Sequence, residues 1–169
     1  MSTTTKSKVP SNPGKAPAAS VRYEDDLYGW VEQQVALLKA GRLTEIDAKN
    51  VAEELSDVGR DQYNRLESAL HILLLRLLKW DHQPTHRSRS WVRSIEVQRR
   101  QIDRVLRENP SLKPRIPEAT REAYHDARGA AAFETGLSKK TFPMALPYDW
   151  PEITTRLVEV ADQRSPDED

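Results

Sequence analysis

The residues best suited to binding are seven arginines between positions 87 and 107. They are Arg87, Arg89, Arg93, Arg99, Arg100, Arg104 and Arg107, and only two acids, Glu96 and Asp103, stand among them. A planar guanidinium donates two parallel hydrogen bonds to a carboxylate or a phosphate, which a lysine ammonium does not. At helical spacing Arg89, Arg93 and Arg100 share one face, and Arg99 lies off it. The segment therefore predicts a surface that contacts anionic groups.

Two kinds of partner fit this arginine-rich segment. One is nucleic acid, whose phosphates would be contacted by Arg87, Arg89, Arg93 and Arg100. The other is an acidic protein surface, within the chain or on a second copy. Lys plus Arg equals Asp plus Glu at 26 each, and no nucleic-acid-binding motif is present. Overall neutrality favours the protein partner.

A cluster of acids precedes the arginines. It contains Glu45, Asp47, Glu53, Glu54, Asp57 and Asp61, with Lys49 and Arg60 as the intervening cations. Glu54, Asp57 and Asp61 are three and four residues apart and share a helix face. Paired carboxylates can bind a divalent metal or share a proton, but the Glu-x-x-His spacing of di-iron bundles is absent. We interpret the cluster as a solvated face or as the acidic side of an ionic interface opposite Arg93 and Arg100.

Metal-dependent and nucleophilic chemistry have little support in the sequence. His82 and His86 are separated by Pro84, so they do not lie on one helical face, and His71 is about 16 Å from His82 along a helix. The chain has no cysteine, no Gly-x-Ser-x-Gly elbow and no glycine-rich phosphate loop. We expect no catalytic residues, no metal site and no cofactor.

Composition predicts a single cytoplasmic domain. The absence of cysteine suits a reducing compartment. The longest apolar run, residues 70–78, contains His71 and Arg76 and is shorter than the ~20 residues of a membrane span, and no hydrophobic signal follows Met1. Residues 1–20 and 163–169 are predicted to be disordered tails around a domain over residues 21–162.

The longest predicted helix begins near Thr44 or Asp47 and ends before Pro84. Its apolar positions keep one face in register: Val51, Leu55, Val58, Leu66, Leu70, Leu73, Leu77 and Trp80. A continuous helix of this length would run about 50 Å. Because neighbouring helices would cover only part of it, either the chain bends at Gly59 or the uncovered part packs against a second copy.

Three other main helices and a short last helix are predicted. The first begins near residues 23–25 and ends at Gly41, with Leu27, Trp30, Val31, Gln34, Leu37 and Leu38 inward. The next is capped by Ser88 or Ser90 and stopped by Asn109-Pro110, and a helix with an alanine face follows from Pro117 to Gly136. A capping box of Asp149 and Glu152 starts the last helix, with Ile153, Leu157 and Val160 inward. Residues 137–147 are predicted to be irregular, with Phe142, Met144 and Leu146 packing over one end of the bundle. The fold class is all-α, an antiparallel helical bundle without a sheet.

Several runs of residues resemble a known family. They are Ala52–Leu55 with Val58-Gly59, Leu66–Ser68, Leu77–Trp80, Gln83-Pro84, Arg87–Trp91, Pro110–Leu112, Tyr124 with Ala127, Glu134–Leu137 and Phe142-Pro143. With them the chain resembles the bacterial, cyanobacteria-rich family called "domain of unknown function 29", from about Tyr23 to Leu157. The resemblance implies an all-helical bundle and no established chemistry.

The predicted function is protein–protein interaction or homo-oligomerisation without catalysis. We expect a homodimer or an unidentified protein partner and no membrane association. Glu54, Asp57 and Asp61 on one side, with Arg93 and Arg100 on the other, are the expected interaction residues. Nucleic-acid binding by the arginine-rich helix and a carboxylate metal site or enzymatic role are the alternatives.

Overall fold

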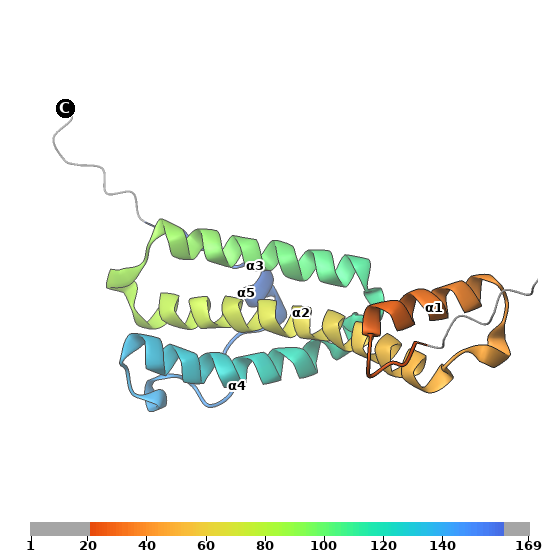
Figure 1. The fold of residues 1–169 in the computed structure, drawn as a ribbon. Helices are drawn as coiled ribbons and strands as arrows, with labels where there is room; N and C mark the ends of the chain where they lie inside the picture. Colours follow the sequence, from red (N-terminus) through yellow and green to blue (C-terminus); the bar gives the residue numbers. More distant parts are fainter. Residues whose placement is uncertain (1–20, 161–169) are drawn as a thin grey trace, which may run out of the picture. The chain divides into compact units, whose positions relative to one another are not determined.

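The fold is all-α, as the sequence predicts. A computed structural model describes residues 21–160 (Figure 1), which contain five α-helices and no strand. The helices are α1 Leu27–Lys39, α2 Ala48–His82, α3 Arg89–Glu108, α4 Ile116–Thr135 and α5 Trp150–Thr155. Short 3-10 turns join them: η1 Leu43–Glu45, η2 Pro84–His86, η3 Pro110–Arg115 and η4 Lys139–Thr141. The predicted tails, and the last two residues of the predicted domain, lie outside the described residues.

The chain divides into two compact units, Met1–Leu55 and Ser56–Asp169, which are described separately. In the first, the Asp26 carboxylate accepts the Gly29 N–H at 2.9 Å, so α1 begins at Leu27, slightly later than predicted. The expected inward stripe of α1 is confirmed for some residues and wrong for others. Trp30 and Gln34 are buried, but Leu27, Val31 and Leu38 are 49%, 38% and 49% exposed. Asp47 caps α2 by accepting the Asn50 N–H at 3.3 Å.

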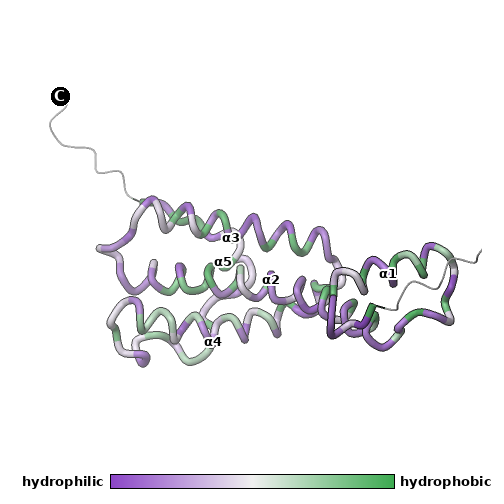
Figure 2. The backbone as a smooth tube through the Cα atoms, viewed as in Figure 1, coloured by the Kyte–Doolittle hydropathy of each residue, from purple (hydrophilic) through white to green (hydrophobic). Residues whose placement is uncertain are grey.

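Helix α2 continues through Gly59 as one helix. It ends at His82, because Pro84 cannot continue a helix and disfavours helical backbone at the residue before it. Burial is confined to its second part. Leu66, Leu70, Leu73 and Leu77 are fully buried, whereas Leu55 and Val58 earlier in the same stripe are 66% and 59% exposed. Figure 2 shows the same change in hydropathy along α2. The expectation that part of α2 is uncovered is met in the described residues.

In the second unit, α2, α3 and α4 lie side by side around one core (Figure 1). Helix α3 contributes Ile95, Ile102, Val105 and Leu106 to it. Helix α4 contributes a face of small residues, in which Ala119, Ala123, Ala127 and Ala131 are buried. Small side chains let the α4 backbone approach its neighbours closely, as the predicted alanine face implies.

The local signals for helix ends are mostly confirmed. Ser88 stands at the start of α3, but its hydroxyl pairs with that of Ser90 at 2.8 Å and caps no backbone N–H. Asn109 ends α3, and Gly136 ends α4 in the left-handed conformation with φ 70°. The Asp149 and Glu152 capping box is present at the start of α5.

Two predicted packing positions after α4 are wrong. Phe142 is buried as expected, but Met144 is 87% exposed. Helix α5 ends at Thr155, and the chain is extended at Arg156 with ψ 127°. Because the helical period no longer applies there, Leu157 is 76% exposed and Val158 is buried in its place.

The burial difference within the second unit leads to a stability prediction. We expect Leu74→Ala to lower the free energy of unfolding by about 2–5 kcal/mol, because it leaves a cavity among fully buried leucines. Leu157→Ala removes the same atoms from an exposed position and should cost below about 0.5 kcal/mol. Urea unfolding followed by circular dichroism measures both, and equal losses would contradict the assigned core.

Candidate functional site

Four arginines form one exposed face of α3, which we call the basic face: Arg89, Arg93, Arg100 and Arg104. Their steps of four, seven and four residues keep them on one side over about 22 Å. Among the described residues, Arg93 and Arg104 have no hydrogen-bond or ion-pair partner. Arg100 lies 3.9 Å from Glu96 in a surface pair that contributes little stability. The guanidinium groups of Arg93 and Arg104 are therefore available to a partner.

A groove lies beside the basic face. It is lined on α3 by Arg89, Val92, Arg93, Glu96 and Arg100, and on its other side by the extended residues 157–160. Exposed Leu157 stands in this second wall. The groove therefore offers an apolar contact next to the row of guanidinium groups.

Two of the three acids of the predicted interface, Glu54 and Asp57, bond to other residues of the described chain. Glu54 accepts a hydrogen bond from the Tyr23 hydroxyl at 2.6 Å, and Asp57 pairs with Arg60 at 3.0 Å. Asp61 is exposed and has no ion-pair partner among the described residues. No ion pair among residues 21–160 joins these acids to Arg93 or Arg100. The expected pairing would have to form between chains, and it stays a prediction.

Arg87, which we assigned to the alternative nucleic-acid surface, contacts its own chain. Its Nε donates to the Trp80 carbonyl oxygen at 2.9 Å, and its guanidinium carbon lies 4.9 Å from the centre of the Trp80 ring. The carbonyl belongs to the last turn of α2, where helical carbonyls lack intrahelical donors. Arg87 therefore secures the turn between α2 and α3.

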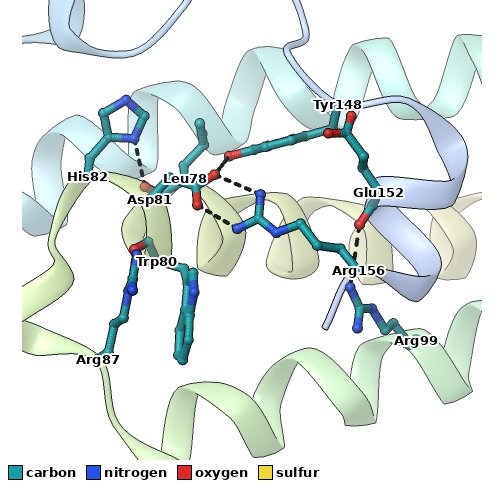
Figure 3. A network of polar contacts seen from close by, with 9 residues as sticks. All are labelled: Leu78, Trp80, Asp81, His82, Arg87, Arg99, Tyr148, Glu152 and Arg156. Atoms are coloured by element: carbon teal, nitrogen blue, oxygen red, sulfur yellow. Dashed lines mark hydrogen bonds and ion pairs between the residues drawn. The ribbon is translucent and has the colours of Figure 1, made fainter. Parts of the chain in front are cut away.

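Asp81 is the centre of a network of polar contacts in the second unit (Figure 3). Arg156 donates two hydrogen bonds to its carboxylate, one of 3.1 Å from Nη1, and the Tyr148 hydroxyl donates a third at 2.7 Å. Burial raises the pKa of Asp81, but hydrogen bonds from Arg156 and Tyr148 outweigh it and leave the pKa below its usual value. Burial, together with the bond to Asp81, raises the pKa of Tyr148. The network joins the end of α2 to the segments before and after α5.

Other arginines donate to carbonyl oxygens of short helices and loops. Arg99 Nε donates to the Ile153 oxygen at 3.0 Å, and its Nη2 lies 3.4 Å from the Glu152 oxygen (Figure 3). From α4, Arg128 donates to the carbonyl oxygens of Phe142 and Lys139 at 3.0 and 3.1 Å. Each guanidinium fixes a segment that has little regular structure of its own.

An ion pair between a buried lysine and a partly exposed glutamate joins α2 to α4. Lys79, only 8% exposed, donates to the Glu134 carboxylate at 2.7 Å, and its ammonium lies 4.9 Å from the centre of the Trp91 ring. Arg76 approaches the same carboxylate at 3.8 Å. Three of the runs that carry the family resemblance, Leu77–Trp80, Arg87–Trp91 and Glu134–Leu137, thus meet at one cluster. Removing one partner of such a pair would leave an uncompensated buried charge.

His82 and His125 contact different residues, and none of these contacts involves another histidine. His82 Nδ1 is 2.9 Å from the Leu78 carbonyl oxygen and its ring packs against Phe142, whereas His125 pairs with Asp126 at 3.0 Å. Within residues 21–160, no group of three or more His, Asp or Glu side chains is placed to hold a metal ion.

Sequence reasoning did not find the Asp81 network or the Lys79 pair. Asp81 is 67 residues from Tyr148 and 75 from Arg156, so no local pattern connects them. The one local signal was Lys79 itself, a charge between Leu78 and Trp80 on the most apolar part of α2.

The Asp81 network leads to a prediction about stability and pH. We expect Asp81→Asn to lower the free energy of unfolding by about 1–3 kcal/mol near neutral pH, because Arg156 and Tyr148 lose a charged acceptor. Since the folded pKa of Asp81 is lowered, its contribution is complete above the unfolded value of about 3.9 and is lost as pH falls through the folded value. The difference between wild type and variant should therefore shrink in acid. Asp103→Asn, in an exposed pair with Arg107, is the matched control and should change little. A pH-independent difference in urea unfolding would count against the network.

None of the α-helices formed by residues 21–160 is long and apolar enough to cross a membrane. No curated protein and no solved structure matches the chain. The family described as "Domain of unknown function DUF29" matches residues 22–157, which is most of the sequence and agrees with the resemblance of the motifs above. The chain belongs to this family.

Proposed function

We propose that the protein is an interaction module that associates with a second copy of itself through the basic face of α3 and the acidic residues of α2. The observation that carries the proposal is the basic face, in which Arg93 and Arg104 have no partner among the described residues. Exposed like charges on one helix face repel one another, and an acidic surface would relieve that repulsion.

The first part of α2 has the character of such an acidic surface. Asp57 and Asp61 lie on one side of exposed Val58, and Leu55 lies one turn before it on the same apolar stripe. The groove beside the basic face combines Arg93 and Arg100 with Leu157. An amphipathic acidic helix therefore complements this groove in both charge and apolarity.

Self-association by these two surfaces would be reciprocal. In a two-fold dimer each copy supplies one basic face and one acidic stretch, so every contact occurs twice. A charge change on either surface should therefore weaken the dimer at two places.

The test is sedimentation velocity at about 0.05 and 0.5 M salt, between which screening of exposed charges increases strongly. We expect a dimer that weakens at high salt. Arg93→Glu with Arg100→Glu should raise the dissociation constant at least about tenfold, because like charges then face each other. Asp57→Arg with Asp61→Arg should do the same, and mixing the two double variants should restore a heterodimer.

Lys139→Glu with Lys140→Glu is the matched control, since it makes the same charge change at exposed positions of η4. It should leave association unchanged. A monodisperse monomer at tens of micromolar, or a dimer indifferent to all three double variants, would overturn the proposal.

A second candidate function, nucleic-acid binding, is favoured by one feature of the same face. Its four cations are all arginines spread over about 22 Å of one helix, a spacing over which several phosphates of one strand could be contacted. The acids Glu96 and Asp103 on α3 and the neutral net charge weigh against it.

This alternative is tested by fluorescence anisotropy with a single-stranded RNA and a DNA duplex at low salt. Binding would fall steeply with salt and disappear in the triple variant Arg89→Glu, Arg93→Glu and Arg100→Glu. No binding at low salt would exclude the alternative, whereas binding by a monomeric protein would place it above self-association.

A further inference from the structure

A cavity on the second unit has the composition of a small-molecule site. It lies between α3, η3 and α5 and has a volume of about 600 Å³. Ligand sites commonly have volumes of about 300–1,000 Å³ and apolar walls with a few polar groups. The apolar lining includes Ile102 and Leu106 of the core and the Trp150 side chain. None of these groups belongs to the basic face.

Three cations line the same cavity, two from α3 and one from η3. They are Arg99, Arg107 and Lys113, and the one acid of the lining is Asp103. The lining therefore has a formal charge of three minus one, or two positive charges. Asp103 pairs with Arg107 at 2.9 Å, which leaves Arg99 and Lys113 without a carboxylate among the described residues.

Arg99 is the fixed member of this set. Its bonds to the Ile153 and Glu152 oxygens hold the guanidinium in place and use two of its five N–H groups. Burial and the nearby charge of Arg156 lower the pKa of Arg99, although Glu96 opposes this effect. The residues that line the cavity around Arg99 carry an excess of positive charge. An anion in the cavity would offset that excess and accept the remaining N–H groups.

We propose that this cavity binds an aromatic anion, a flat ring that carries one phosphate or carboxylate group. The ring would pack against Trp150 and the apolar floor, and the anionic group would accept hydrogen bonds from Arg99 and Lys113. A neutral ring leaves the cations unsatisfied. A free inorganic anion leaves the apolar floor exposed to water.

The test uses four matched probes: 1-naphthyl phosphate, 1-naphthoate, neutral 1-naphthol and inorganic phosphate. The protein has four tryptophans, so the ¹⁵N-labelled full chain gives up to four indole N–H signals in nuclear magnetic resonance spectra. Trp150→Phe assigns the signal at the cavity. We expect both aromatic anions to shift the Trp150 signal saturably, at least about tenfold more tightly than 1-naphthol or inorganic phosphate. The tighter of the two identifies the preferred anionic group.

Charge variants locate the site. Lys113→Glu should weaken binding of the aromatic anions about tenfold, the effect of losing one charge-assisted hydrogen bond. Arg107→Glu should also weaken it, because it replaces a positive charge of the lining with a negative one. Both side chains are exposed, and unchanged signals from the other tryptophans verify the fold of each variant. Lys139→Glu, on η4, should bind as the wild type does. The proposal is overturned if no probe shifts the Trp150 signal saturably, if 1-naphthol binds as tightly as the anions, or if the variants bind unchanged.

Discussion

The second half of α2 is the constraint on which the larger unit depends. From Leu66 to Trp80 nearly every position facing α3 or α4 is buried, several of them completely. Transfer of that much apolar surface out of water is the dominant favourable term in folding. The facing helices are shaped to this surface: α3 meets it with branched side chains such as Ile95 and Ile102, and α4 meets it with alanines.

Around this core, the arginines fall into two groups that differ in their contacts. Arg87, Arg99 and Arg128 each donate to backbone carbonyls at the end of a helix or in a loop. These carbonyls lack partners in regular structure, and a guanidinium can satisfy more than one of them at once. Among the described residues, Arg93, Arg100 and Arg104 of the basic face make no such contacts with carbonyls. A count of arginines in the sequence therefore overstates the number available to a partner, and the structure separates the two groups.

The features that the sequence predicted correctly depend on residues only a few positions apart. Asn109 before Pro110, the left-handed Gly136, and the capping box of Asp149 with Glu152 each act within a few residues, so spacing alone located these helix ends. One failure came from extending the helical period beyond the end of the helix. Leu157 was assigned inward at helical spacing, but α5 had already ended.

The contacts that join distant segments were not predictable in that way. Asp81 looks like an ordinary acid at the end of a helix, and only the folded chain brings Tyr148 and Arg156 to it. The same holds for the cavity beside Trp150, whose walls come from three elements. Hydrophobic periodicity identifies which helix face is buried, but it does not identify which segments cover it.

The two proposed binding surfaces use different residues of α3. Arg93 and Arg100 lie on the exposed face, whereas Ile102 and Leu106 form the floor of the cavity on the side toward the core. A helix fixes the angles between its residues. A substitution in one surface therefore does not move the residues of the other. A charge change at Arg93 thus leaves the lining of the cavity intact, and one at Lys113 leaves the basic face intact. The two binding activities can consequently be separated by substitution, and the failure of one would not remove the physical argument for the other.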